Sequence, residues 1–363
     1  MVNKIVKVLL LGAAFSADLH MDGYSRSSDK AKVVAICDTN PERAKNLADK
    51  YGITDYTVYT NIKEAVEKTD CDMVDICLPN FLHCEAALLA LDKGKNIICE
   101  KPLSTTVEDA QKIVDTAAKA GLHIYYAEDW LFAPAIRKAL SIVEDGAIGR
   151  TLYTRARECH SGSHSPFAQS IAYCGGGCMV HLGVHPVSFM LAQKNNEWSE
   201  LVAMTSGGGE KNFVHKAMEG EDWSACLIRF LDGTTALLEG NYVTKGGMED
   251  VIDLYGTDGC LHIDLNFTGP ISCFSIPGVN YVVEKAEINT GWTRPSVDEK
   301  YSLGYVDEIG YFIDCCAKGE DARVGLRGVD GLEALKVINY IYQSAREGKK
   351  VINPKYSVEK AEV

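Results

Sequence analysis

The chain has 363 residues, more than one ordinary domain holds, and this length predicts two domains that each bury a core. Its composition, 46% hydrophobic and 24% charged, is typical of a soluble globular protein, and its formal net charge of -13 argues against nucleic acid or an anionic membrane surface as the main partner. The 13 cysteines show no paired spacing apart from the neighbours Cys315 and Cys316, which favours a reducing, cytoplasmic location over a disulfide framework.

The N-terminus allows two interpretations. Lys4 and Lys7 precede an apolar run that ends in small residues, which is the pattern of a secretory signal. The same residues fit better as a first strand, Ile5 to Leu11, followed by a turn. No run approaches the length that spans a membrane, so we expect no membrane association.

The first third of the chain alternates between strand-like and helix-like segments. The expected strands are Ile5 to Leu11, Val33 to Cys37, Tyr56 to Tyr59, Met73 to Leu78, Asn96 to Cys99 and His123 to Ala127. The expected helices are Asp18 to Ser27, Pro41 to Tyr51, Ile62 to Lys68, Leu82 to Lys93 and Thr106 to Ala120. This alternation predicts βαβ units that form a parallel sheet with right-handed crossovers.

A turn between the first strand and helix resembles the phosphate-binding G-x-G-x-x-G/A motif. Gly12 and the final small residue Ala17 are present, but Ala14 replaces the glycine that lets backbone approach a pyrophosphate. The second strand ends at Asp38, whose carboxylate can accept hydrogen bonds from ribose hydroxyls and repels a 2′-phosphate, which favours NAD over NADP. The alternative is that Asp38 is a turn residue that caps the helix beginning at Pro41.

The stretch from Asn96 to Pro102 predicts a buried strand that ends at a charged pair. Pro102 cannot continue a central strand, so Glu100 and Lys101 fall at the carboxyl end of the sheet, where ligands bind in open α/β folds. The alternative is an ordinary ion pair on the surface.

The second half has a different pattern. Further alternating runs predict strands at Arg150 to Glu158, Leu201 to Thr205, Ala225 to Leu231, Thr235 to Tyr242, Val251 to Tyr255, Leu261 to Leu265 and Ile271 to Ile276. Asp232-Gly233 is a hairpin signal, and we expect a mainly antiparallel sheet with one open face. Helices are expected at Tyr305 to Lys318 and Val329 to Glu347, packing back on the first domain. The polar, glycine-rich loop Gly207 to Asp222 is expected to be a mobile cover.

Histidines gather in a short part of this second half. Three glycines, Gly175 to Gly177, predict a flexible loop that leads into a helix, with His181 and His185 on one helical face. His160 and His164 lie upstream, near a strand end. One hypothesis is a zinc site; another is proton transfer from a hydroxyl as hydride leaves the same carbon; a third is that His160 and His164 are core residues bonded to backbone.

Together these motifs resemble the Gfo/Idh/MocA oxidoreductases. The matching features are Gly12 to Ala17 with His20, Asp38, Pro79-Asn80 with His83, Glu100-Lys101-Pro102, Pro134, Gly146 to Gly149, Gly175 to Gly177, Gly183 with His185, and Ser344 to Val351. The resemblance implies a Rossmann domain, residues 1–127, and an α/β domain with an open, mainly antiparallel sheet, residues 128–363. It also implies NAD(P)-dependent oxidation or reduction of a sugar, cyclitol or glycoside, and a homo-oligomer, a dimer or tetramer, built through the open sheet.

The resemblance assigns roles to individual residues. Lys101 and His185 are the expected catalytic residues, with His181 nearby and Glu100 orienting Lys101. Cofactor contacts are expected from Gly12, Ala14, Phe15, Ser16, Asp38, Arg43, Pro79, Asn80, His83, Glu100 and Lys101. Substrate contacts are expected from His160, His164, His181 and His185. Apart from the resemblance, the position of Trp130 after the sixth expected strand predicts that it stacks on a sugar ring, with a core aromatic role as the alternative. No metal is assigned.

Two residues depart from the family's pattern. Ala14 stands where glycine is usual, and His181 stands where many members carry aspartate, so a fixed negative charge is absent there. Two alternatives to a dehydrogenase therefore stay open. One is a glycosidase or lyase that uses NAD as a recycled redox group, and the other is an inactive NAD-binding sensor.

Overall fold

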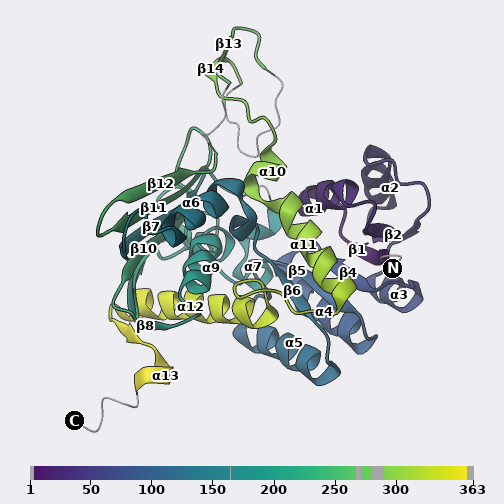
Figure 1. The fold of residues 1–363 in the computed structure, drawn as a ribbon, viewed down its shortest axis with the longest axis horizontal. Helices are drawn as coiled ribbons and strands as arrows, with labels where there is room; N and C mark the ends of the chain where they lie inside the picture. Colours follow the sequence, from purple (N-terminus) through teal and green to yellow (C-terminus); the bar gives the residue numbers. More distant parts are fainter. Residues whose placement is uncertain (1–3, 164, 267–270, 280–288, 358–363) are drawn as a thin grey trace. The chain divides into compact units, whose positions relative to one another are not determined.

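The computed structural model describes residues 4–163, 165–266, 271–279 and 289–357. The chain divides into two compact units, traced in Figure 1. Unit 1 comprises Met1–Phe132 and Gly304–Glu333, and unit 2 comprises Ala133–Leu303 and Ala334–Val363. Among the described residues, no helix is long and apolar enough to cross a membrane.

Unit 1 is built on a six-stranded parallel sheet with the order β3-β2-β1-β4-β5-β6. Its strands are β1 (Val6–Leu11), β2 (Ala31–Cys37), β3 (Thr57–Tyr59), β4 (Met73–Ile76), β5 (Asn96–Glu100) and β6 (Ile124–Ala127). The connecting helices are α1 (Phe15–Arg26), α2 (Pro41–Lys50), α3 (Ile62–Lys68), α4 (His83–Asp92) and α5 (Val107–Ala120). The predicted Rossmann-type parallel sheet is therefore confirmed.

Local sequence explains where these elements begin and end. Asn40 caps α2 by accepting hydrogen bonds from the backbone N–H groups of Glu42 and Arg43, and Pro41 occupies the first turn. Thr106 caps α5 in the same way, and Gly121 ends that helix with a φ of 65°. The central strand β1 is apolar and its residues 8–11 are fully buried, as expected for a strand covered on both faces.

A later segment completes unit 1. Helix α11 (Tyr305–Lys318) packs against α1. The contact is close at Gly23, where a Cβ would lie 2.6 Å from the Cβ of Ile309. The 20-residue helix α12 (Gly328–Glu347) begins in unit 1 and continues in unit 2.

Unit 2 is built on a seven-stranded mixed sheet with the order β12-β11-β7-β10-β9-β8-β15. Its strands are β7 (Thr151–Cys159), β8 (Trp198–Thr205), β9 (Trp223–Phe230), β10 (Thr235–Asn241), β11 (Glu249–Gly256), β12 (Cys260–Asp264) and β15 (Val351–Ile352). In the described sheet, neighbouring strands run antiparallel except β7 and β10, which are parallel. The predicted mainly antiparallel sheet is confirmed, and β9 and β10 form the hairpin expected at Asp232-Gly233.

Further short elements complete unit 2. They are α6 (Pro134–Glu144), α7 (Ile171–Cys174), α8 (Cys178–His181), α9 (Val184–Gln193), α10 (Glu299–Leu303) and α13 (Pro354–Ser357), with β13 (Cys273–Ser275) and β14 (Gly291–Thr293) as a separate two-stranded sheet. The expected strand at Ile271 to Ile276 thus forms only its central part, and it pairs with β14 rather than with the large sheet.

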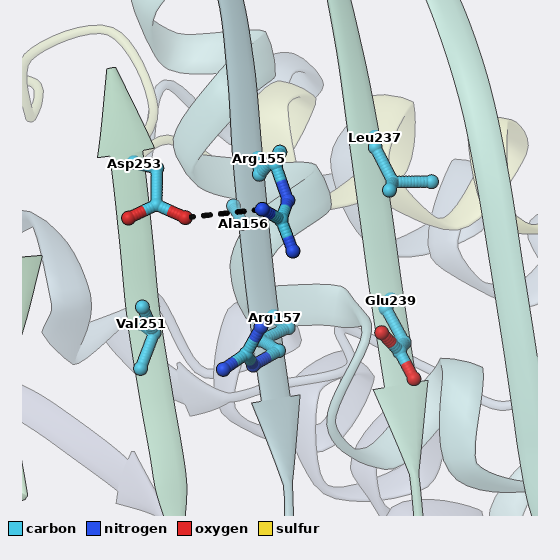
Figure 2. Close-up of a pocket in the computed structure, with 7 residues that line it drawn as sticks. All are labelled: Arg155, Ala156, Arg157, Leu237, Glu239, Val251 and Asp253. Atoms are coloured by element: carbon cyan, nitrogen blue, oxygen red, sulfur yellow. Dashed lines mark ion pairs between the residues drawn. The ribbon is translucent and has the colours of Figure 1, made fainter. Parts of the chain in front are cut away.

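The large sheet of unit 2 has one covered face and one open face. Ala156, Leu238 and Ile252 are buried on the covered face, where α8 packs on β10 and α9 on β7 and β10. Figure 2 shows the side chains of β7, β10 and β11 that point to the other face, among them Arg155, Leu237 and Asp253.

Candidate active site

The turn after β1 is shaped by a close approach of backbone. Gly12 has a φ of 98°, and a Cβ there would lie 2.2 Å from the carbonyl oxygen of Cys77, so no other residue fits without distortion. Ala14 is extended and precedes α1, and its side chain cannot cap the first N–H groups of the helix. Phe15, which was predicted to contact the cofactor, is about half exposed at the start of α1. The geometry is that of an anion-binding turn at a helix N-terminus.

The next predicted cofactor residue, Asp38, lies in the same region at the end of β2. Its carboxylate accepts hydrogen bonds from the backbone N–H groups of Ala13 at 3.0 Å and Asn40 at 2.8 Å. The guanidinium of Arg43 lies 3.3 Å from the same carboxylate. Asp38 thus fastens the glycine turn to the end of β2, while the helix cap itself is Asn40.

The Pro79-Asn80 motif leads through a 3-10 turn, Asn80–Leu82, into α4. His83 is fully buried, and its two ring nitrogens each lie 2.8 Å from a backbone carbonyl oxygen, one of Leu78 and one of Pro102. Burial lowers the pKa of His83 below its ordinary value. His83 therefore lies between the carbonyl groups of the segments that follow β4 and β5.

The predicted Glu100-Lys101 pair lies at the end of β5, but Glu100 is not on the surface. Its carboxylate is nearly buried, with one oxygen 3.0 Å from His20 Nε2 and the other accepting the backbone N–H of Lys101 at 3.1 Å. Burial acts to raise the pKa of Glu100, but the hydrogen bond and charge of His20 outweigh it and lower the pKa. The alternative of an ordinary surface ion pair is wrong, because Glu100 is held inside unit 1.

Unit 1 also buries several acidic groups, one of which interacts electrostatically with Lys101. Glu128 and Glu308 are fully buried and Asp129 nearly so. Burial, with the charges of Asp129 and Glu308, raises the pKa of Glu128 well above its ordinary value, and Lys101 opposes this shift. Glu128 is therefore a buried carboxyl group in electrostatic contact with Lys101, which sequence reasoning did not assign.

Trp130 is only 1% exposed and is among the largest fully buried side chains. This burial is what the core aromatic alternative requires.

In unit 2, the expected common helical face of His181 and His185 is wrong. His181 ends α8, whereas His185 lies in the first turn of α9, and Leu182 and Gly183 separate the two helices. At this break the backbone lies close to β10, since a Cβ at Gly240 would lie 2.7 Å from the backbone nitrogen of Gly183. The two imidazoles consequently have different partners, and the i, i+4 basis for a zinc site is lost.

His185 is paired with a carboxylate. Its Nε2 atom lies 3.5 Å from Glu158 on β7, and both side chains are nearly buried. A buried carboxylate next to an imidazole stabilises the protonated form of the ring. This is the arrangement of a histidine that accepts a proton.

The other histidines gather around Tyr242, a residue that sequence reasoning missed. The hydroxyl of Tyr242 lies 2.5 Å from Nδ1 of His181, and its carbonyl oxygen lies 2.8 Å from a ring nitrogen of His215. The ring of His160 packs on Tyr242 at 5.2 Å between centroids, and His160 Nδ1 accepts the backbone N–H of Gly162. His160 thus makes the hydrogen bond to backbone that its interpretation as a core residue requires. His164 lies outside the described residues.

The three-glycine segment is tightly packed rather than a loose loop. A Cβ at Gly177 would lie 2.2 Å from the carbonyl oxygen of Glu221. The carboxylate of Glu221 accepts the backbone N–H groups of Gly177 and Met179. The glycines therefore allow α8 to begin against Glu221.

The loop Gly207 to Asp222 is held by hydrogen bonds among its own residues. The fully buried Asn212 donates its amide hydrogens to the carbonyl oxygens of His215, Met218 and Gly220. The carboxylate of Asp222, also fully buried, accepts the backbone N–H groups of residues 213–215. Such bonding fixes the base of the loop, while Phe213 and Val214 remain exposed at its surface.

Comparisons with known proteins bear on both units. Residues 6–127 match the family model described as "Oxidoreductase family, NAD-binding Rossmann fold", and residues 136–262 match the "GFO/IDH/MocA C-terminal domain". A 1,5-anhydro-D-fructose reductase from Ensifer adhaerens is 30% identical over 257 residues, covering 69% of this chain and 74% of that protein. A D-apiose dehydrogenase from Paraburkholderia graminis is 26% identical over 360 residues, covering 96% and 90%.

A solved structure has the same fold over nearly the whole chain. It is GenD2 from gentamicin A biosynthesis in complex with NAD, with a TM-score of 0.87 and 22% identity over 97% of each chain. At this identity the likeness concerns the fold alone.

Proposed function

The chain belongs to the Gfo/Idh/MocA oxidoreductase family, and from this premise we propose that it is an NAD-dependent dehydrogenase. Its proposed substrate is a secondary hydroxyl group of a sugar, cyclitol or glycoside, which it oxidises to a ketone, or the reverse. The observation that carries the proposal is the Glu100-Lys101 pair, in which a buried, ionised carboxylate holds the backbone of Lys101 at a strand end.

The residues of unit 1 fit a dinucleotide. The turn at Gly12 and the uncapped start of α1, with Ala14, Phe15 and Ser16, suit the pyrophosphate. Asp38 and Arg43 would contact the adenosine ribose, and Pro79, Asn80, His83, Glu100 and Lys101 the nicotinamide half. When bound, NAD supplies the hydride acceptor.

We assign NAD rather than NADP as the preferred cofactor. The carboxylate of Asp38 would repel a 2′-phosphate. Arg43 can offset this repulsion only in part, because Asp38 already lies 3.3 Å from its guanidinium.

The proposed chemistry divides between a cation and a base. The ammonium of Lys101 hydrogen-bonds to the reacting hydroxyl oxygen and stabilises the negative charge that develops as its proton leaves. His185 takes that proton, and Glu158 stabilises the imidazolium that results. His181, bonded to Tyr242, orients a neighbouring hydroxyl, and His160 and His164 complete the proposed substrate contacts.

The open sheet of unit 2 supports a proposed homo-oligomer. The face in Figure 2 combines charged side chains such as Arg155 and Glu239 with Leu237. On the adjoining strands, Val202, Met204 and Leu227 are each more than 40% exposed, with values of 44%, 69% and 51%. Exposed apolar area of this kind marks protein interfaces, and we expect a dimer or tetramer in light scattering, with Leu227→Arg shifting it toward monomer.

The test of the activity is nicotinamide absorbance after mixing the protein with NAD and a panel of sugars, cyclitols, and O- and C-glycosides. NADH formation that is lost in Lys101→Ala is the expected result. Sugar release without NADH would instead indicate a glycosidase or lyase that recycles NAD, and NAD binding without any turnover would indicate a sensor.

A further inference from the structure

A buried ionic network lies next to the Glu100-Lys101 pair within unit 1. Its centre is His20 on α1, which has no exposed surface. His20 Nδ1 lies 2.9 Å from Oδ2 of Asp75 on β4, and its Nε2 lies 3.0 Å from Oε1 of Glu100 on β5. The hydroxyl of Tyr24, one helical turn after His20, donates to Asp75 at 2.8 Å.

This geometry defines the protonation state of His20. An ionised carboxylate can only accept hydrogen bonds, so contact with one at each ring nitrogen requires a hydrogen on both nitrogens. Burial acts to lower the pKa of His20, but the charge and hydrogen bond of Asp75, together with the contribution of Cys77, outweigh it and raise the pKa well above the ordinary value. His20 is therefore a buried imidazolium between two carboxylates.

We propose that His20 is a positioning residue, which as an imidazolium bound to Asp75 keeps the carboxylate of Glu100 ionised and fixed, and thereby fixes Lys101. The link to Lys101 is the hydrogen bond of 3.1 Å from its backbone N–H to the second oxygen of Glu100. The inference rests on the proposed function, because it concerns how Lys101 is held for hydride transfer.

Several groups face His20 and contribute to its charge state. Asp75 and Cys77 face it from the β4 segment and Glu100 from β5. Tyr24, on the same helix as His20, donates to Asp75. From α11, Glu308 interacts electrostatically with His20, and the ring of Tyr305 lies 6.4 Å away. Burial raises the pKa of Glu308 well above its ordinary value, which favours its uncharged form.

Two substitutions test the network, one that removes the imidazolium and one that removes the charge of Asp75. His20→Gln removes the cation, so the pKa of Glu100 rises and the acid limb of the kcat profile moves to higher pH. Asp75→Asn leaves His20 in place with a lower pKa, so kcat gains a new alkaline limb where His20 loses its proton. Each change is expected to lower kcat about 10- to 100-fold, as removal of groups that orient a site does, with little change in NAD affinity.

The control is His123→Gln, a partly exposed histidine of unit 1 whose ring lies 3.7 Å from Asp321 and which should keep wild-type kinetics. A folded His20→Gln protein with wild-type kcat and pH profile would overturn the inference. If His20→Gln does not fold, an Asp75→Asn protein whose kcat profile lacks the alkaline limb would overturn it instead. Wild-type protein that forms no NADH would overturn the proposed function as well, whereas normal wild-type turnover with unaffected variants overturns this inference alone.

The remaining alternative to a protonated His20 is a metal ion bound by His20 and its neighbours. Ligand atoms of His20, Asp75 and Cys77 all lie within 4.8 Å of one another. Stoichiometric zinc in the purified wild-type protein, lost in Cys77→Ser, would overturn the inference by making His20 a neutral ligand. NMR of labelled histidine is expected instead to show hydrogens on both ring nitrogens of His20.

Discussion

The two units hold their functional histidines in opposite ways. In unit 1, His20 lies between two carboxylates that favour its protonated form. In unit 2, Nε2 of His185 lies 3.5 Å from the carboxylate of Glu158, and His181 is bonded to a neutral tyrosine hydroxyl. A histidine that must take up and release a proton needs the second kind of surroundings, whereas one that fixes its neighbours needs the first.

The largest effect is expected at His185. His185→Ala should lower kcat by about two to four orders of magnitude, because the alkoxide must then form without a base, while NAD affinity stays nearly unchanged. Steady-state kinetics and NAD titration measure both quantities. Undiminished turnover would remove His185 from the reaction.

Lys101 should have the next largest effect. Lys101→Met keeps the length of the side chain but loses the cation, and we expect kcat to fall about 10²- to 10³-fold. Lys138→Met, at a lysine of unit 2 without an assigned role, serves as the matched control. Similar losses in both variants would contradict a specific role for Lys101.

A substitution at Tyr242 tests the role of the hydrogen bond between its neutral hydroxyl and His181. Tyr242→Phe deletes only the hydroxyl bonded to His181 Nδ1, so kcat/KM should fall about 3- to 10-fold, the value of one hydrogen bond. His181→Ala in the Tyr242→Phe background should then cost little more. Fully multiplicative losses would show that the two residues act independently.

A structural change in unit 2 should affect stability alone. In Gly177→Ala the new Cβ would meet the carbonyl oxygen of Glu221, and we expect a loss of about 1–3 kcal/mol in the free energy of unfolding. Gly310→Ala, on α11 and with only the Oγ of Ser27 at 3.5 Å, should cost far less. Equal costs would contradict the tight packing described for the glycine segment.

The smallest expected effect is on the way the stability of the fold depends on pH. Because the folded pKa of His20 lies above its unfolded value of about 6.5, its ion pairs stabilise the fold fully below that pH, and the contribution is lost as the pH rises through the folded pKa. The difference in melting temperature between wild type and His20→Gln should therefore shrink toward alkaline pH. A difference that grows with pH would mean that His20 is neutral.

Much of unit 1 could be predicted because its signals are local. Each strand there ends at a turn or a charged motif, so the expected strand at Asn96 to Cys99 differs from β5 by one residue. The ionic network was less visible, although Asp75 stands inside an apolar strand and a buried carboxylate needs a partner. His20 and Tyr24, four residues apart on α1, were the available signal for that partner.

Unit 2 was harder because its contacts join distant segments. Nothing in the spacing of the sequence places Tyr242 against His181, or shows that β7 and β10 are parallel. The break between α8 and α9 lies where Gly240 approaches Gly183, a contact between distant segments that the helical period of His181 and His185 cannot reveal. Helix α6, by contrast, has a proline at its start and was a missed local signal.

The most direct test of the central claim follows the hydrogen itself. A sugar, cyclitol or glycoside that gives turnover in the panel would be prepared with deuterium on the carbon of each secondary hydroxyl, and the cofactor analysed by mass spectrometry after turnover. We predict reduced NAD that carries one deuterium, formed by Lys101→Met about 10²- to 10³-fold more slowly than by wild type. Substrate consumption with no label in the reduced cofactor would contradict the account.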